Sequence, residues 1–221
     1  MPRLHDVVTA GKARCIGASS MYARQFAGMN HVAGPNGWTR FVPMPPQLNL
    51  SCREEEREML PLGREEGVGV IPWSLLAQGF LAGNRTRDGG GETTRAKTDP
   101  FANHQDADFA VRDVLTEVAK ARGLSNMQVA PAGVLGRPGI TAPMIGAGKP
   151  NHIGDALSAP EATLSPDEIE KPEAPYRPRS VANLVAAAHG GLPQTAIAGL
   201  GIGTFRGRRA PAPAAGRAVS R

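Results

Sequence analysis

Polar residues and glycines follow four short apolar runs, and they are the residues with the most specific chemistry. The runs are Ala13–Ser19, Thr39–Met44, Val68–Trp73 and Ile140–Gly148. At or just after their ends the sequence places hydroxyls, a carboxamide, an aromatic ring and a glycine-lysine segment: Ser19, Ser20, Gln47, Trp73, Ser74 and Gly146–Lys149. Such groups can stack on a ring, hydrogen-bond an amide and bring backbone N–H groups to a phosphate. None is a convincing general acid or base, so the pattern predicts cofactor binding rather than proton transfer.

Each of these residues also has an ordinary structural explanation. Ser19 and Ser20 could cap a helix that begins at Met21, Trp73 could be a core side chain, and Lys149 could simply precede a helix. The five histidines and two cysteines show no metal-ligand spacing, so we expect no metal. A glycine-rich stretch at Gly199–Gly203 resembles part of a dinucleotide motif but does not complete it.

Helical patterns separate the four runs. Apolar residues recur at helical spacing between Tyr22 and Val32, and Ser51 with Glu54 has the spacing of a capping box. A later helix should end at Gly123, and two further helices should be capped by Ser125 and Ser165. In the helix before Gly123 we expect one apolar face, made of Phe109, Val114, Val118 and Ala121.

Short apolar runs that alternate with helices predict βαβ units and a parallel sheet, which is an α/β fold. Four units of roughly 30 residues fill about residues 5–158. This spacing suits an open doubly wound sheet or half of a (β/α)8 barrel.

Charge and composition limit the other functions. The chain has 221 residues and a net charge of +5. From Ala174 onward it holds seven arginines and no Asp or Glu, so the positive charge belongs to the C-terminal stretch. We therefore do not expect nucleic acid as a partner of the folded part. No apolar run is long enough to span a bilayer, and two cysteines without a signal-like N-terminus indicate a cytoplasmic protein.

Several stretches together resemble the aldo-keto reductases. They are "LHDVVTAGKARCIGASSMYARQF", "NGWTRFVPM", "REEEREMLPLGREEGVGVIPWSLLAQGFLAG", "TAPMIGAGKPNHIGDAL" and "LSPDEIE…PYRP". They occur in family order over about residues 3–178 and look most like the bacterial members that use NADP. The resemblance implies a (β/α)8 TIM-barrel fold, a small carbonyl substrate and NADP(H) as cofactor without a metal.

The resemblance also assigns roles to individual residues. Trp73 matches the aromatic that stacks on the nicotinamide, and the segment from Ser74 through Leu81, which includes Leu76 and Gly79, matches the loop around the pyrophosphate. Ser19 and Ser20 match the pair that hydrogen-bonds the carboxamide. The segment from Gly146 through Ala156, which includes Lys149 and His152, matches the part that holds the adenosine 2′-phosphate. These nine residues are the predicted cofactor site: Ser19, Ser20, Trp73, Ser74, Leu76, Gly79, Gly146, Lys149 and His152.

The matched stretches correspond to the last four β/α units of the family. We therefore interpret residues 1–178 as the C-terminal half of the reductase domain and residues 179–221 as a disordered Ala/Gly/Pro/Arg-rich tail, with one short helix at Val181–Ala188. The family's catalytic Asp, Tyr, Lys and His have no counterpart here, so we assign no catalytic residue. Pro45 and Pro46 stand where the family has Gln-Asn. We expect an inactive chain that self-associates or pairs with a missing N-terminal half; the alternative is a non-catalytic NADP-binding remnant or half-barrel assembly partner.

Overall fold

The four predicted runs lie side by side in chain order and are all parallel. The computed structural model describes residues 1–88, 90–91, 93–98 and 104–178. Ile16 bridges to Phe41, and β1 (Pro43–Met44) pairs with β2 (Gly69–Val70). Val70 in turn bridges to Ile140. The α/β alternation and the parallel pairing that the sequence predicted are therefore present.

The strands are much shorter than the apolar runs that form them. Among the described residues only β1 and β2 make a continuous ladder, while the outer runs are joined to it by single bridges. Prolines explain this: Pro43, Pro45, Pro46, Pro72 and Pro143 lie within or next to the runs. Because proline has no backbone N–H, each of them removes a donor from the ladder.

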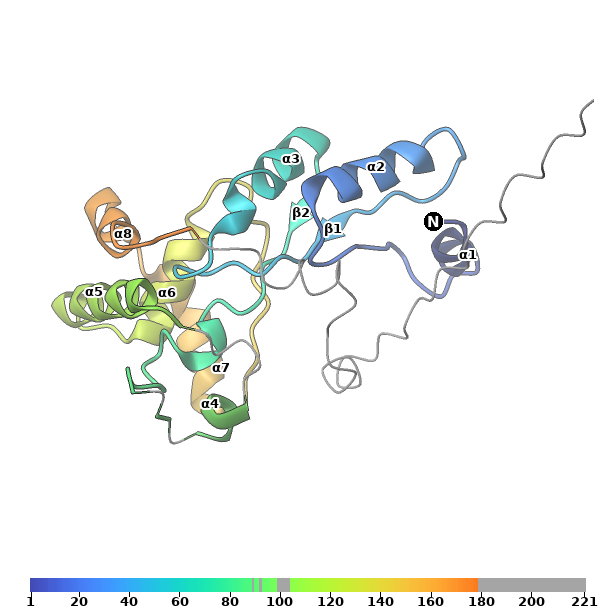
Figure 1. Cartoon of the computed structure of the whole chain (residues 1–221). Helices are drawn as coiled ribbons and strands as arrows, with labels where there is room; N and C mark the ends of the chain where they lie inside the picture. The colour runs from blue at the N-terminus through green and yellow to red at the C-terminus, as the bar shows by residue number, and fades with distance from the viewer. Residues whose placement is uncertain (89, 92, 99–103, 179–221) are drawn as a thin grey trace, which may run out of the picture.

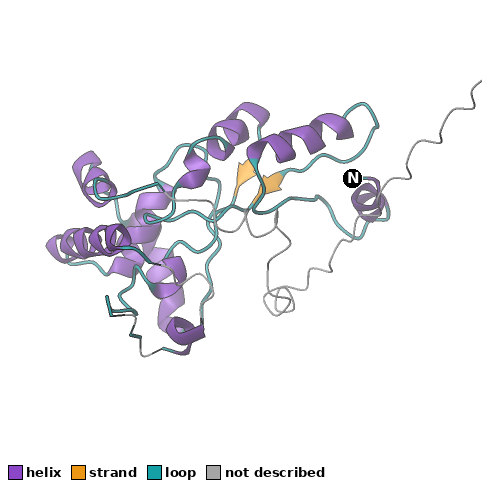
Figure 2. Cartoon of the chain, viewed as in Figure 1, coloured by secondary structure: helices purple, strands orange, loops and turns teal. Residues whose placement is uncertain are grey.

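Helices and 3₁₀ helices make up about half of the described chain and strands only a small part of it, as Figure 2 shows. In chain order they are α1 (Pro2–Thr9), α2 (Ala23–Ala33), η1 (Glu54–Glu56), α3 (Met59–Glu66), η2 (Ala77–Gly79), α4 (Thr94–Thr98), α5 (Asp106–Arg122), α6 (Asn126–Leu135), α7 (Pro150–Ser158), η3 (Ala159–Glu161) and α8 (Pro166–Glu173). In Figure 1, α2 and α3 lie beside β1 and β2, whereas α5, α6 and α8 gather at the other end of the molecule. None of the helices in the described part is long and apolar enough to cross a membrane.

The core divides along the same lines. Phe26 of α2 packs against Phe41 with ring centroids 5.6 Å apart, and Met44 and Met59 complete this cluster. A second cluster joins α5 and α6 to the segment after β2 through Phe80, Leu81 and Leu115. The strands are thus covered by α2 and α3, but Val42, Met144 and Ile145 remain 46–52% exposed on the runs.

Three predicted helix ends are confirmed, whereas the predicted cap at Ser51 and the predicted apolar face of α5 are wrong. Gly123 ends α5 with a φ of 64°, and Ser125 and Ser165 begin α6 and α8 with capping boxes. Ser51, however, caps no helix, because its hydroxyl donates to Asn49 Oδ1 at 2.9 Å and α3 begins only at Met59.

The apolar face predicted for α5 differs from the one that the structure buries. The structure buries Val111, Leu115 and Ala119 together with Phe109 and Val118. Val114 is only half-buried and Ala121 is exposed. The long 17-residue helix packs against α6 and the loop from β2, and this packing rather than the local pattern selects the buried face. Helix α1 was not anticipated, and it has no buried residue.

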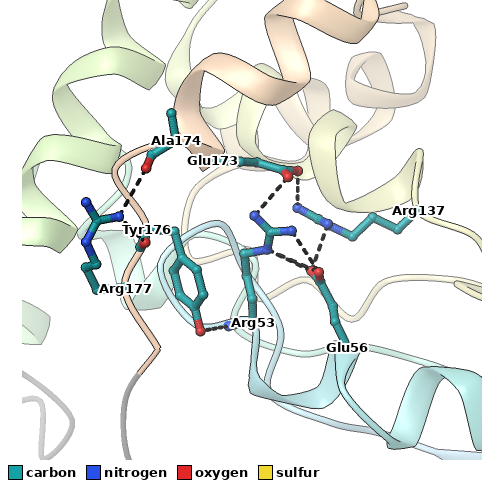
Figure 3. A network of polar contacts seen from close by, with 7 residues as sticks. All are labelled: Arg53, Glu56, Arg137, Glu173, Ala174, Tyr176 and Arg177. Carbon is teal, nitrogen blue, oxygen red and sulfur yellow. Dashed lines mark hydrogen bonds and ion pairs between the residues drawn. The ribbon is translucent and has the colours of Figure 1, made fainter.

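A closed ring of four charges holds α8 against η1 and the end of α6 (Figure 3). Arg53 pairs with Glu56 and with Glu173, each at 2.8 Å. Arg137 pairs with the same two carboxylates at 2.8 and 2.7 Å. Each charge therefore meets two of opposite sign, and the four side chains are only 11–23% exposed.

The expectations for the C-terminal stretch fall outside the described residues. This applies to the predicted disorder of residues 179–221 and to the predicted helix at Val181–Ala188.

Candidate cofactor-binding site

The carboxyl ends of the four runs are tied to one another by hydrogen bonds. Ser19 Oγ donates to the carbonyl oxygen of Pro45 at 2.7 Å. The backbone N–H of Trp73 donates to Pro46 O at 2.9 Å, and that of Met144 donates to Pro72 O at 2.8 Å. The predicted residues at the ends of the first three runs are therefore brought to one edge of the sheet, as parallel pairing requires.

The two serines do not cap α2. Its N-cap is Tyr22, so the structural alternative for Ser19 and Ser20 does not hold. Their hydroxyls lie 3.3 Å apart, and Ser20 has a φ of 51°. A non-glycine residue in this left-handed region is uncommon and is often found at functional sites.

The proline pair contributes carbonyl oxygens to this edge. Pro45 O accepts from Ser19 and Pro46 O accepts from Trp73, as described above. Gln47 is therefore placed directly opposite Trp73 in a parallel bridge, and Leu48 N donates back to Trp73 O at 3.3 Å. Trp73 is half-buried.

The segment after Trp73 is the most unusual backbone in the described chain. Ser74, Ala77 and Gln78 have φ values of 62°, 46° and 59°, although none is glycine. We call residues 74–84 the Ser74 loop. Within it, Ser74 Oγ is buried and has no hydrogen-bond partner in the described structure. Buried hydroxyls are normally paired, so this one is available to a ligand that carries an acceptor.

Gly79 is required by both its conformation and its surroundings. Its φ is 92°, and a Cβ atom there would lie 2.3 Å from Asn84 Nδ2. Asn84 closes the loop, since its amide donates to Gln78 O at 3.3 Å and its backbone N–H donates to Gly79 O at 3.2 Å. Leu76 is half-buried and packs against the core cluster of α5 and α6, so it anchors the loop to that cluster.

The remaining predicted residues lie on the exposed segment that leads into α7. Lys149 is the N-cap of this nine-residue helix, and its side chain is exposed. His152 Nδ1 accepts a hydrogen bond from the backbone N–H of Gly148 at 3.3 Å. A Cβ atom at Gly146 would meet nothing within 4 Å, so this segment has open space around it. The helix dipole and the Lys149 ammonium both favour an anion here.

These features fit a dinucleotide. An unpaired buried hydroxyl and left-handed backbone suit a phosphate, a half-buried indole suits a flat ring, and Lys149 at a helix start suits a second anionic group. Within residues that the structure describes, no group of three or more His, Cys, Asp or Glu side chains could hold a metal ion.

One possible proton donor is engaged elsewhere. Tyr176 OH donates to Glu54 Oε1 at 2.5 Å beside the charge ring. Burial and this hydrogen bond raise the pKa of Tyr176 above its ordinary value, which keeps the hydroxyl protonated.

Sequence reasoning missed the conformation of the Ser74 loop and the side chain that contacts it, Asn49. No local signal predicts a positive φ at Ser74, Ala77 or Gln78, because glycine is the usual marker. Asn49 lies 25 positions before Ser74, and its Nδ2 donates to Ser74 O at 3.0 Å.

Comparison with known proteins gives a consistent result. The model of the aldo/keto reductase family matches residues 1–176. The chain is 39% identical over 190 residues to versiconal hemiacetal acetate reductase of Aspergillus parasiticus, a match covering 82% of this chain and 53% of that protein. It is 40% identical over 181 residues to a putative aryl-alcohol dehydrogenase of Schizosaccharomyces pombe, covering 80% and 50%. An aldo-keto reductase of Alternaria alternata is 38% identical over 179 residues, covering 80% and 48%.

The chain thus spans about half the length of the curated relatives it matches. These three relatives are fungal, so the narrower resemblance to bacterial members stays a prediction.

Proposed function

The chain belongs to the aldo/keto reductase family, and from this premise we propose that it holds NADP(H) at the edge formed by Ser19, Trp73 and the Ser74 loop. Family membership implies the (β/α)8 barrel. In this proposal residues 1–178 supply its last four β/α units, and the reaction is the reduction of a small aldehyde or ketone. When bound, NADPH supplies the hydride.

The observation that carries the proposal is the Ser74 hydroxyl. It is buried, lacks an internal partner and begins a loop whose backbone is left-handed at three non-glycine positions. An unsatisfied buried polar group costs roughly 1–3 kcal/mol, so a ligand that accepts a hydrogen bond from this hydroxyl recovers that energy. A pyrophosphate oxygen is such an acceptor.

The other residues have separate binding roles. Trp73 would stack on the nicotinamide, and Ser19 and Ser20 would hydrogen-bond its carboxamide. Leu76 and Gly79 would shape the loop around the pyrophosphate. Gly146 and His152 would line the adenosine end, where Lys149 would pair with the 2′-phosphate.

Binding of NADPH can be tested by fluorescence titration of the full chain. We expect saturable quenching of tryptophan emission, and Ser74→Ala should weaken affinity by about tenfold or more, as expected for a hydrogen bond to a charged group. Lys149→Ala should weaken NADPH more than NADH, because only NADPH carries the 2′-phosphate. Lys171→Ala, an exposed lysine on α8, is the matched control. Equal losses for both cofactors would refute the role of Lys149.

Turnover separates this proposal from its alternative. We propose that the chain alone does not reduce carbonyls, since nothing at the edge is placed as a proton donor among the described residues; proton donation contributes roughly 10²–10⁴-fold in enzymes that use it. We expect no NADPH oxidation above background with a panel of aldehydes. Clear steady-state reduction that disappears in Trp73→Ala would contradict this.

The alternative is a non-catalytic NADP-binding remnant or half-barrel assembly partner. The exposed apolar residues Val42, Met144 and Ile145 favour assembly with a complementary β/α half or with a second copy. Co-expression with the first four β/α units of a family member tests it: recovered carbonyl reduction would identify the chain as one half of an active barrel.

A further inference from the structure

Asn49 is one of the most buried polar side chains in the described structure, at 1% exposure. Both polar atoms of its amide group are hydrogen-bonded to neighbours. Oδ1 accepts from the backbone N–H of Ser51 at 3.0 Å and from its hydroxyl at 2.9 Å. Nδ2 donates to Ser74 O at 3.0 Å. The backbone of Asn49 also exchanges two 3.1 Å hydrogen bonds with Cys52, which fixes the turn that carries the side chain.

Ser74, the recipient of this bond, is in a conformation that L-residues avoid. A φ of 62° brings Cβ close to the following carbonyl and persists only where the surroundings stabilise it. Two donors converge on the Ser74 carbonyl: Asn49 Nδ2, and the backbone N–H of Ala77 at 2.8 Å. The second bond is local to the loop, whereas Asn49 reaches the Ser74 carbonyl from the segment that follows the second run.

The side chain of Ser74 is oriented by the same backbone. A fixed φ and a fixed carbonyl direction determine where Cβ points, and they restrict the χ1 rotamers open to the unpaired Oγ. We propose that Asn49 is a positioning residue that holds Ser74 in its left-handed conformation, so that the hydroxyl is presented to a cofactor phosphate. This role rests on the proposed NADP(H) site, and it acts through Ser74 alone.

A purely structural Asn49 makes a different prediction. If Asn49 only stabilises the fold through its hydrogen bonds, its removal destabilises the chain. The loss of NADPH affinity is then the same whether or not residue 74 carries a hydroxyl. If it positions Ser74, its effect on affinity depends on that hydroxyl. A double-mutant cycle measures this difference.

The cycle uses NADPH titrations of the full chain with Asn49→Ala, Ser74→Ala and both together. We expect Asn49→Ala to weaken affinity about tenfold in the Ser74 background and less than about twofold in the Ser74→Ala background. Ser51→Ala is the matched control, because it removes one partner of Asn49 Oδ1 and leaves the bond from Nδ2 to Ser74 intact. It should change affinity by less than about twofold.

A stability cycle covers the case in which Asn49→Ala folds poorly. Glycine adopts a positive φ without strain, so Ser74→Gly should reduce the need for Asn49. The urea midpoint lost on Asn49→Ala should therefore be smaller in the Ser74→Gly background than in the parent.

The failures can be told apart. If the unsubstituted chain does not bind NADPH, the proposed function falls and the cofactor role of Asn49 falls with it. If the chain binds NADPH and Asn49→Ala costs the same affinity in both backgrounds, only the positioning role is overturned. Equal midpoint losses in the Ser74 and Ser74→Gly backgrounds would also overturn it.

Discussion

Replacing Arg137 by methionine should test whether the charge ring contributes to stability. Methionine keeps much of the length and the apolar stem and removes only the cation. The change deletes two ion pairs, at 2.8 Å to Glu56 and at 2.7 Å to Glu173. Both carboxylates retain Arg53 as a partner, so neither becomes an isolated buried charge.

The expected cost follows from this geometry. Orphaning a buried charge costs roughly 3–5 kcal/mol, and an exposed pair contributes roughly 0–1 kcal/mol. The ring lies between these cases, because its side chains are 11–23% exposed and each carboxylate stays paired. We expect Arg137→Met to lower the free energy of unfolding by about 2 kcal/mol.

Urea unfolding followed by circular dichroism measures this loss. With an m-value of about 2 kcal/mol per M, the midpoint should fall by about 1 M at constant slope. Arg40→Met is the matched control, since Arg40 and its partner Glu66 are 51% and 41% exposed. A midpoint for Arg137→Met no lower than that for Arg40→Met would show that closing the ring adds nothing to ordinary surface pairs.

Two further predictions concern single positions. Burial, with a smaller contribution from Glu54, raises the pKa of Glu55 from 4.5 to about 7. Between these pH values the native chain keeps a proton that the unfolded chain has lost, so stability falls as pH rises through this window. Glu55→Gln should therefore raise the free energy of unfolding at pH 8 by at most about 3 kcal/mol and leave it unchanged at pH 4; urea midpoints at both pH values check this, and an equal gain at both would contradict it. Gly79→Ala should cost about 2 kcal/mol or more in thermal unfolding, because of its φ of 92° and the 2.3 Å approach of Asn84. Gly28→Ala, in α2 with nothing within 4 Å, should instead gain up to about 1 kcal/mol, and similar shifts for the two glycines would refute the steric argument.

Features that depend on neighbours along the chain could be predicted from the order of residues alone. The apolar runs with helices between them predicted parallel α/β pairing, and the structure pairs the runs in that order. Gly123, Ser125 and Ser165 marked helix ends correctly, because a cap is satisfied within a few residues. The quoted stretches likewise indicated the family that the comparisons show.

Features that depend on contacts between distant segments could not be predicted in this way. The sequence predicted Ser51 as a helix cap, but its hydroxyl donates to Asn49 Oδ1 instead. The same Asn49 amide donates to the carbonyl of Ser74, 25 positions further along the chain. Arg53 and Glu173 are 120 positions apart and yet form one side of the charge ring. The left-handed φ of Ser74 also depends on such a contact, because its local preference is for other conformations and a donor from a distant segment stabilises this one. Local sequence sets which elements can form, whereas the pairing of buried polar groups is fixed only when those elements meet.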